Sequence, residues 1–133
     1  MMLWLDEYRS FLAASAGDQA QQVGRLAERI AFAEQLAAPL TSPRVDGLRS
    51  GQPTEIKAKI VRAGVSLAGR FVDISELNLA NAGLYLIFLF EPHKRAISVF
   101  EIRAQEMHRR LTAAHSVTLG FLKEMTPVWS FSD

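Results

Sequence analysis

The chain contains no cysteine among its 133 residues. This absence excludes disulfide bonds, thiolate nucleophiles and cysteine-ligated zinc. It also fits a reducing compartment, so we expect a cytoplasmic protein. A membrane-spanning segment is lacking too, because no apolar run approaches the roughly 20 residues that cross a bilayer. Asp6 and Glu7 come early and no basic segment precedes the first apolar residues, so a signal peptide is not expected.

An excess of charge of one sign is also lacking, since the formal net charge is only +1. The charges are nevertheless unevenly distributed, and residues 44–70 form a locally basic stretch. Its charged residues are Arg44, Arg49, Lys57, Lys59, Arg62 and Arg70, set against Asp46 and Glu55. Local clustering matters more than net charge for binding a polyanion. Two interpretations stay open, a polyanion-binding surface and a solvated strand face.

Length and composition favour a single domain over residues 1–133, because 49% of the chain is apolar and disordered chains are poor in such residues. Residues 1–40 are expected to form a helical hairpin. In its second helix, Val23, Leu26 and Ile30 recur at helical spacing. Pro39 then ends the helix, since proline cannot continue it.

Residues 55–103 are expected to form a small antiparallel sheet. In residues 55–61 apolar and polar side chains alternate, which is typical of a half-exposed strand. Residues 84–90 are apolar without a break, which predicts a central strand that is covered on both faces. This strand and residues 96–102 would form a long hairpin around the polar turn 91–95. For residues 62–83 a strand, a lid and a loop all stay open.

Residues 104–125 are expected to form a long C-terminal helix, because Met107, Leu111 and Val117 belong to a set of apolar residues that recur every three or four positions. The predicted fold class is therefore α+β. It consists of an N-terminal helical hairpin, a small antiparallel sheet of three to four strands and the long C-terminal helix.

This order of elements resembles the RelE/ParE toxins of bacterial type II toxin–antitoxin systems. Residues 42–51, SPRVDGLRSG, look like the family's loop after the second helix, and 55–60, EIKAKI, look like its first core strand. Residues 84–102 look like its central hairpin. The resemblance covers roughly residues 5–111. It implies a metal-independent, ribosome-dependent mRNA endoribonuclease that needs no cofactor and that a cognate antitoxin neutralises.

The implied reaction is attack of a ribose 2′-hydroxyl on the adjacent phosphate, which needs a base, an acid and cations. Arg103 would support the phosphate charge, and His108, or His93 in the turn, would titrate. Glu101 would be a base or the ion-pair neighbour of Arg103. The RNA-binding residues are expected to be Lys57, Lys59, Arg62, Lys94 and Arg95.

Two other functions stay open, a ParE-like gyrase inhibitor and a non-enzymatic interaction module. The module would be a degenerate toxin fold or a phage or accessory subunit, with Trp129 and Phe131 as a protein contact. A metal site is not expected. His108 and His115 are about 10 Å apart along a helix, and no set of histidines and carboxylates has convincing ligand spacing.

Overall fold

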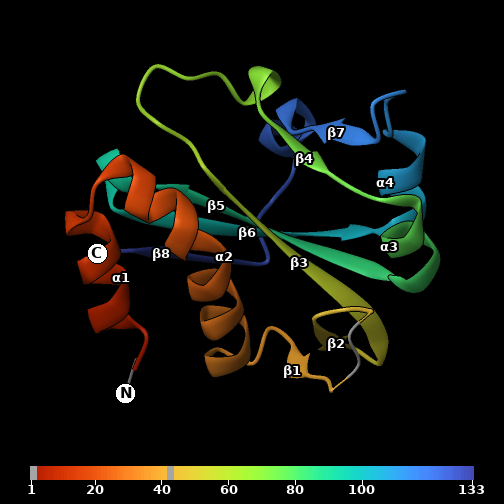
Figure 1. Ribbon diagram of the computed structural model, residues 1–133, viewed down its shortest axis with the longest axis horizontal. Helices are drawn as coiled ribbons and strands as arrows, with labels where there is room; N and C mark the ends of the chain where they lie inside the picture. Colours follow the sequence, from red (N-terminus) through yellow and green to blue (C-terminus); the bar gives the residue numbers. More distant parts are fainter. Residues whose placement is uncertain (1–2, 42–43) are drawn as a thin grey trace.

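The computed structural model describes residues 3–41 and 44–133. The strands are β1 (Ala38–Pro39), β2 (Gly47–Arg49), β3 (Gln52–Ile60), β4 (Phe71–Asp73), β5 (Leu84–Glu91), β6 (Ala96–Arg103), β7 (Ser116–Thr118) and β8 (Trp129–Ser132). The helices are α1 (Leu5–Ala13), α2 (Ala16–Ala33), α3 (Glu76–Asn81) and α4 (Ala104–Arg109), with 3-10 turns η1 (Leu67–Gly69), η2 (Pro92–Lys94) and η3 (Gly120–Glu124). The strands form a six-stranded sheet in the order β1-β2-β3-β5-β6-β8 and a separate pair, β4 and β7 (Figure 1).

The N-terminal helices α1 and α2 confirm the predicted helical pair. Ser15 caps α2, because its side chain accepts a hydrogen bond from the backbone N–H of Asp18. Its buried stripe includes the predicted Val23, Leu26 and Ile30. α2 therefore lies with its apolar side on the sheet.

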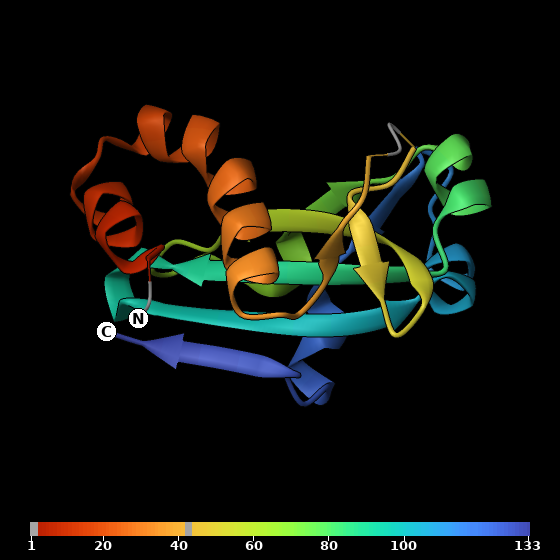
Figure 2. The same ribbon diagram turned by 90° about the horizontal axis from the view of Figure 1, so that it is seen from below.

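The large sheet carries a hydrophobic core on each face. Leu86, Phe88 and Phe90 of β5 pack into the first core, beneath α1 and α2. Tyr85, Ile87 and their neighbours pack into the second core, beneath β4, β7 and the short helices. Figure 2 shows β3, β5, β6 and β8 one below the other, with β5 between β3 and β6. β5 is apolar without a break because both of its faces are covered.

The predicted hairpin of residues 83–103 is confirmed. β5 and β6 pair antiparallel from Leu84 with Arg103 to Glu91 with Ala96. Between them, Arg95 takes a left-handed φ of 50° and closes the turn. The hairpin is thus the centre of the sheet, as its sequence indicated.

The predicted antiparallel sheet of three to four strands is wrong. The main sheet has six strands, and β3 and β5 pair parallel, with Thr54 opposite Leu84 and Ile60 opposite Phe90. The cause is residues 61–83, which pass through η1, β4 and α3 and return to the end of the sheet at which β3 begins. A crossover of this length is what a parallel pair requires.

The predicted long helix over residues 104–125 is also wrong. α4 ends at Arg109, and the chain continues as β7, η3 and β8. Thr112 and Ser116 bond to each other through their side chains, and His115 between them has a left-handed φ of 56°. Such local bonds of Ser and Thr compete with helix formation. Val117 then pairs with Val72 of β4, so burial in the second core replaces the helix.

The aromatic tail packs against the N-terminal helix. Ring centroids of Trp129 and Phe131 on β8 lie 5.9 Å and 4.9 Å from that of Trp4. Both tail residues are half-buried, so the protein contact expected of them is in large part made within the chain. Across residues 3–41 and 44–133, no helix has the length and apolarity needed to cross a bilayer.

Candidate functional site

The large sheet separates residues that the sequence predicted to act together. Lys57 and Lys59 pair with Ile87 and Leu89, whose side chains belong to the second core. Glu101 pairs with Leu86, which belongs to the first core. Paired residues on neighbouring strands point to the same face. The lysines therefore lie on the face opposite to Glu101.

The three predicted catalytic residues do lie together. Glu101, Arg103 and His108 line a surface depression of about 820 Å³ where β6 runs into α4. Glu101 Oε1 accepts a hydrogen bond of 2.8 Å from Arg49 Nε, so Arg49 on β2 is its ion-pair partner. Arg103 and His108 are exposed. The depression thus lacks the lysines that the predicted mechanism requires.

Lys94 and Arg95 lie at the turn of the hairpin and are engaged by carboxylates. Lys94 Nζ is 3.2 Å from Glu91 Oε2, and Arg95 Nη2 is 2.7 Å from Asp133 Oδ2. Hydrogen bonds from Arg9 and Arg95 lower the pKa of Asp133 to about 2. The contacts of Asp133 with Arg9 and Arg95 hold the end of the chain against α1 and the hairpin.

Arg62 follows β3 and points to the α2 side, opposite to the face of Lys57 and Lys59. Its Nη1 donates a hydrogen bond of 2.7 Å to Gln19 Oε1 on α2. Arg62 and Lys59 line one cavity at the end of β3. The basic face of β3 therefore consists of Lys57 and Lys59, and Arg62 adds a cation on the α2 side where the strand ends.

A carboxyl group that the sequence analysis did not single out lies at the open edge of β3. Asp46 precedes β2, and its backbone N–H donates to the carbonyl oxygen of Thr54. Its Oδ2 accepts a hydrogen bond of 2.7 Å from the backbone N–H of Ile56. β2 pairs with β3 only as far as Thr54, so Asp46 occupies the first edge position beyond β2.

The hairpin of β2 and β3 places Asp46 there. Ser50 and Gly51 form a two-residue turn and both have positive φ, 52° and 76°, as a type I′ turn requires. Gly47 passes so close to β1 that a Cβ atom would stand 2.6 Å from the carbonyl oxygen of Ala38. The position therefore requires glycine, and Asp46 is held just before it.

Glu55 completes a buried pair with Asp46. Glu55 is only 8% exposed and pairs with Tyr85 on the second-core face. Its Oε2 is buried without a hydrogen-bond partner, and so is the hydroxyl of the fully buried Tyr85. Unpaired polar atoms in such surroundings are costly and rare in folded proteins. Glu55 and Tyr85 therefore place two unpaired polar groups next to each other beneath the second core.

Electrostatics links Glu55, Asp46 and a third carboxyl group on α2. Burial, a hydrogen bond that the protonated Glu55 carboxyl group donates to Asp46, and the charge of Asp46 raise the pKa of Glu55 to about 7, while Lys57 opposes the shift. Burial, then the charge of Asp46 and a hydrogen bond with it, raise the pKa of Glu28. Asp46 therefore lies between Glu28 on α2 and Glu55 on β3. We call Glu28, Asp46 and Glu55 the carboxyl cluster.

The carboxyl cluster suits a hard cation in its donor atoms. Among residues 3–41 and 44–133, no three His, Asp or Glu side chains are arranged as a complete metal-ligand set. Glu28 and Glu55 approach Asp46 from opposite faces of the sheet, which accounts for this. Mg²⁺ does not need such a set, because it commonly takes one or two protein carboxylates and completes its shell with water and phosphate. Asp46 and Glu55 fit that requirement.

A signal for this site is present in the sequence. Ser50-Gly51 is a turn dipeptide, and it separates Asp46 from the acid-x-Lys triplet Glu55-Ile56-Lys57. The hairpin of β2 and β3, which the sequence analysis did not predict, brings these residues together. Glu28 has no such signal, because only the packing of α2 on the sheet brings it to Asp46.

Comparisons of the chain with protein-family models, with curated proteins and with solved structures find no match. A functional assignment therefore depends on the geometry of the chain itself.

Proposed function

We propose that this chain is a nuclease that hydrolyses phosphodiester bonds with a divalent cation held by Asp46 and Glu55. One observation carries the proposal. The buried Glu55 carboxyl group hydrogen bonds with Asp46 and keeps an unpaired oxygen, and Lys57 follows on the same face of β3. A paired carboxylate for a cation and an ammonium group for a phosphate are the components that metal-assisted phosphodiester hydrolysis uses.

The raised pKa of Glu55 supports cation binding rather than a purely structural role. With a pKa of about 7, the Glu55 carboxyl group holds a proton for about half of the time at neutral pH. Burial is the largest cause of this raised pKa, and a divalent cation offsets both the cost of the buried charge and the repulsion from Asp46. The bound cation therefore replaces the proton, and the affinity for it rises with pH.

The residues of the site can be given separate tasks. When bound, Mg²⁺ polarises a phosphoryl oxygen and lowers the pKa of coordinated water. Lys57 stabilises the negative charge that builds up on the phosphoryl oxygens. The attacking water loses its proton to solvent as the water oxygen bonds to phosphorus. The bond between phosphorus and the leaving oxygen then breaks, and the leaving oxygen takes a proton from solvent.

A nucleic acid is the phosphodiester that the surrounding charge favours. Lys59 continues the basic face of β3 beyond Lys57, and Arg62 lines the same cavity as Lys59 at the end of the strand, so a polyanionic strand is attracted past the carboxyl cluster. This proposal replaces the expectation of metal-free cleavage with cation-dependent hydrolysis. It keeps the expected substrate class.

A RelE-like endoribonuclease, neutralised by an antitoxin, is the second candidate. One observation favours it, the shared depression of Glu101, Arg103 and His108. That enzyme would cleave mRNA on the ribosome without a metal ion. It would depend on Arg103 and His108, which lie on β6 and α4, rather than on the carboxyl cluster.

A cleavage assay separates the two candidates. The purified chain is incubated with fluorescent single-stranded and double-stranded DNA and RNA, in Mg²⁺, in Mn²⁺ and in EDTA. We expect cleavage only with a cation, and we expect Asp46→Asn, Glu55→Gln and Lys57→Ala each to reduce it by about 100-fold or more. Arg103→Ala serves as the matched control on the opposite face and should retain activity.

Cleavage in EDTA that Arg103→Ala abolishes, on ribosomes or free RNA, would favour the second candidate. Folded protein that cleaves none of the four substrates with Mg²⁺ or Mn²⁺ would contradict the proposal. Circular dichroism of each variant establishes that a loss of cleavage is not a loss of fold.

A further inference from the structure

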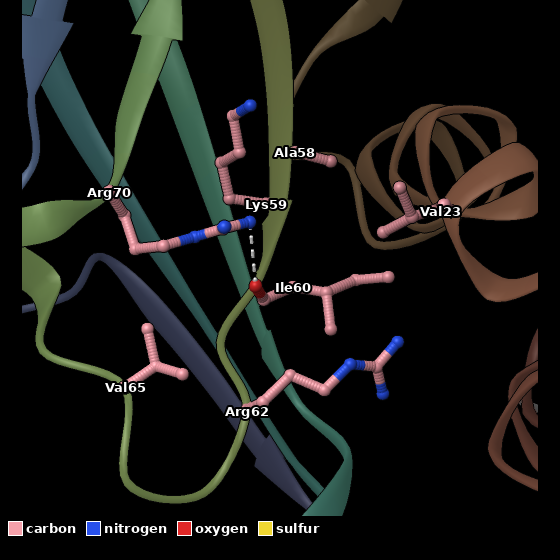
Figure 3. A pocket seen from close by; sticks show the side chains of 8 residues that line it. Val23, Ala58, Lys59, Ile60, Arg62, Val65 and Arg70 are labelled. Carbon is pink, nitrogen blue, oxygen red and sulfur yellow. Dashed lines mark hydrogen bonds between the residues drawn. The ribbon is translucent and has the colours of Figure 1, made fainter. Parts of the chain in front are cut away.

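The open edge of β3 continues from the carboxyl cluster into a groove. Figure 3 shows this groove where β3 ends, between α2 and the segment that follows β3. Its volume is about 280 Å³. Val23, Ala58 and Ile60 line it from the α2 side, and Val65 lines it from the other side. The groove therefore has apolar walls large enough for a group of about the size of one nucleotide.

Three cations surround these apolar walls. Lys59, Arg62 and Arg70 line the groove, and within the described part of the chain none of them forms an ion pair with a carboxylate. Arg70 Nη2 donates a hydrogen bond of 3.1 Å to the carbonyl oxygen of Ile60, and its Nε is buried without an acceptor. Other arginines of the chain, such as Arg49 and Arg95, do hold carboxylates. The groove thus presents uncompensated positive charge.

Exposed apolar side chains adjoin the same groove. Val65 is 44% exposed, and Phe71 next to Arg70 is 47% exposed. Lys59 Nζ lies 5.6 Å from the centroid of the Phe71 ring. An aromatic ring beside cations is the combination with which proteins bind unpaired bases and the phosphates that join them.

The groove lies close to the carboxyl cluster along β3. Glu55, Lys57 and Lys59 share one face, and each step of two residues along a strand covers about 6.7 Å. Lys59 is two such steps from Glu55, about 13 Å, so a strand that enters the groove can reach the Asp46–Glu55 pair within about two extended nucleotides.

We propose that this groove binds an unpaired nucleotide, so that the proposed nuclease acts on single-stranded nucleic acid. The inference rests on the proposed function for its substrate class. The preference for a single strand over a duplex follows from the residues of the groove. A duplex keeps its bases stacked inside and offers only phosphates, which would leave the apolar walls uncovered. An unpaired nucleotide covers these walls with its base and neutralises the cations with its phosphates.

The test is binding without cleavage. Fluorescence anisotropy in EDTA measures the affinity of the full chain for a labelled 12-nucleotide DNA, the same sequence as RNA and the matching DNA duplex. We expect the single strands to bind at least about tenfold more tightly than the duplex. The DNA and RNA arms show which sugar the groove prefers.

Two variants act on the groove and have matched controls. Val65→Asp places a negative charge beside the cations, and Lys59→Ala removes one of them; both should weaken single-strand binding by about fivefold or more. The controls are Val128→Asp, at a position that is 42% exposed, and Lys123→Ala. Both positions lie outside the groove, so these variants should change the affinity for single strands by less than about twofold. All four positions are on the surface or half-buried, so folding should be preserved.

Equal affinity for duplex and single strand would overturn the inference, and so would single-strand binding that ignores both groove variants. The proposed function survives that result if the chain still cleaves duplex DNA with Mg²⁺. Conversely, selective single-strand binding without any cation-dependent cleavage would support the groove and reject the nuclease.

Discussion

Replacing Glu55 with glutamine should change how the stability of the protein depends on pH. Glutamine has the same shape and cannot ionise. Burial and Asp46 raise the pKa of Glu55 from 4.5 to about 7 in the folded protein. The folded state thus binds more protons than the unfolded state between these values, so the free energy of unfolding falls as pH rises. The contribution of the Glu55 proton to the free energy of unfolding is fully present below pH 4.5 and is lost as the pH rises through 7.

The size of the effect follows from the same shift. Each pKa unit corresponds to about 1.4 kcal/mol, so Glu55 should make the wild-type protein about 2.5 kcal/mol less stable at pH 8 than at pH 5. In Glu55→Gln this difference should disappear, leaving only the pH dependence of the other groups. Glu55→Gln should raise the free energy of unfolding relative to the wild type mostly at pH 8, where the wild type carries the buried charge.

Urea unfolding at pH 5 and pH 8, in EDTA, measures both proteins under conditions that exclude divalent cations. Glu124→Gln is the matched control, because Glu124 is exposed and far from the carboxyl cluster. The reasoning fails if Glu55→Gln keeps the wild-type difference between the two pH values, or if Glu124→Gln removes as much of it.

Three further substitutions test other parts of the structure. Tyr85→Phe removes a buried hydroxyl that has no partner, so it should change the free energy of unfolding by less than about 1 kcal/mol while weakening Mn²⁺ affinity in calorimetry. Gly47→Ala should destabilise the protein by about 1–3 kcal/mol in urea unfolding, because its Cβ would stand 2.6 Å from the carbonyl oxygen of Ala38. Trp129→Ala should cost about 2–3 kcal/mol, since it removes the ring contact with Trp4; an unchanged midpoint of thermal unfolding would show that β8 contributes little.

The parts of the fold that could be predicted are those with strong local patterns. The stripe of α2 recurs at helical spacing and is buried as expected. The run Leu84–Phe90 lacks polar residues because β5 has a core on each face, and this makes a central strand visible in the sequence.

The direction of a strand has no comparable local signal. Whether β3 and β5 pair parallel depends on where residues 61–83 take the chain, and the regular elements of that segment are short: a 3-10 turn, a three-residue strand and a six-residue helix. The apolar residues of 104–125 do recur as in a helix. They are buried here by β7 and η3, so the pairing of Val117 with Val72 overrides the helical pattern.

The candidate site was missed for a related reason. Its members come from α2, from the residue before β2 and from β3, and only the folded sheet brings Glu28, Asp46 and Glu55 together. Lys57 and Lys59 were recognised as a basic face, but the face to which Glu101 points could not be inferred without the register of β3, β5 and β6. The lysines and Glu101 could act together only if their side chains lay on the same face of the sheet.

The central claim is that Asp46 and Glu55 exchange a proton for a divalent cation. Isothermal titration calorimetry with Mn²⁺ at pH 7, in two buffers of different ionisation enthalpy, tests it directly. With the pKa of Glu55 at about 7, we expect one bound cation and the release of about half a proton. Asp46→Asn and Glu55→Gln should abolish both, and Glu101→Gln should keep both. Absence of Mn²⁺ binding, or equal binding and proton release in the wild type and in both cluster variants, would contradict the account.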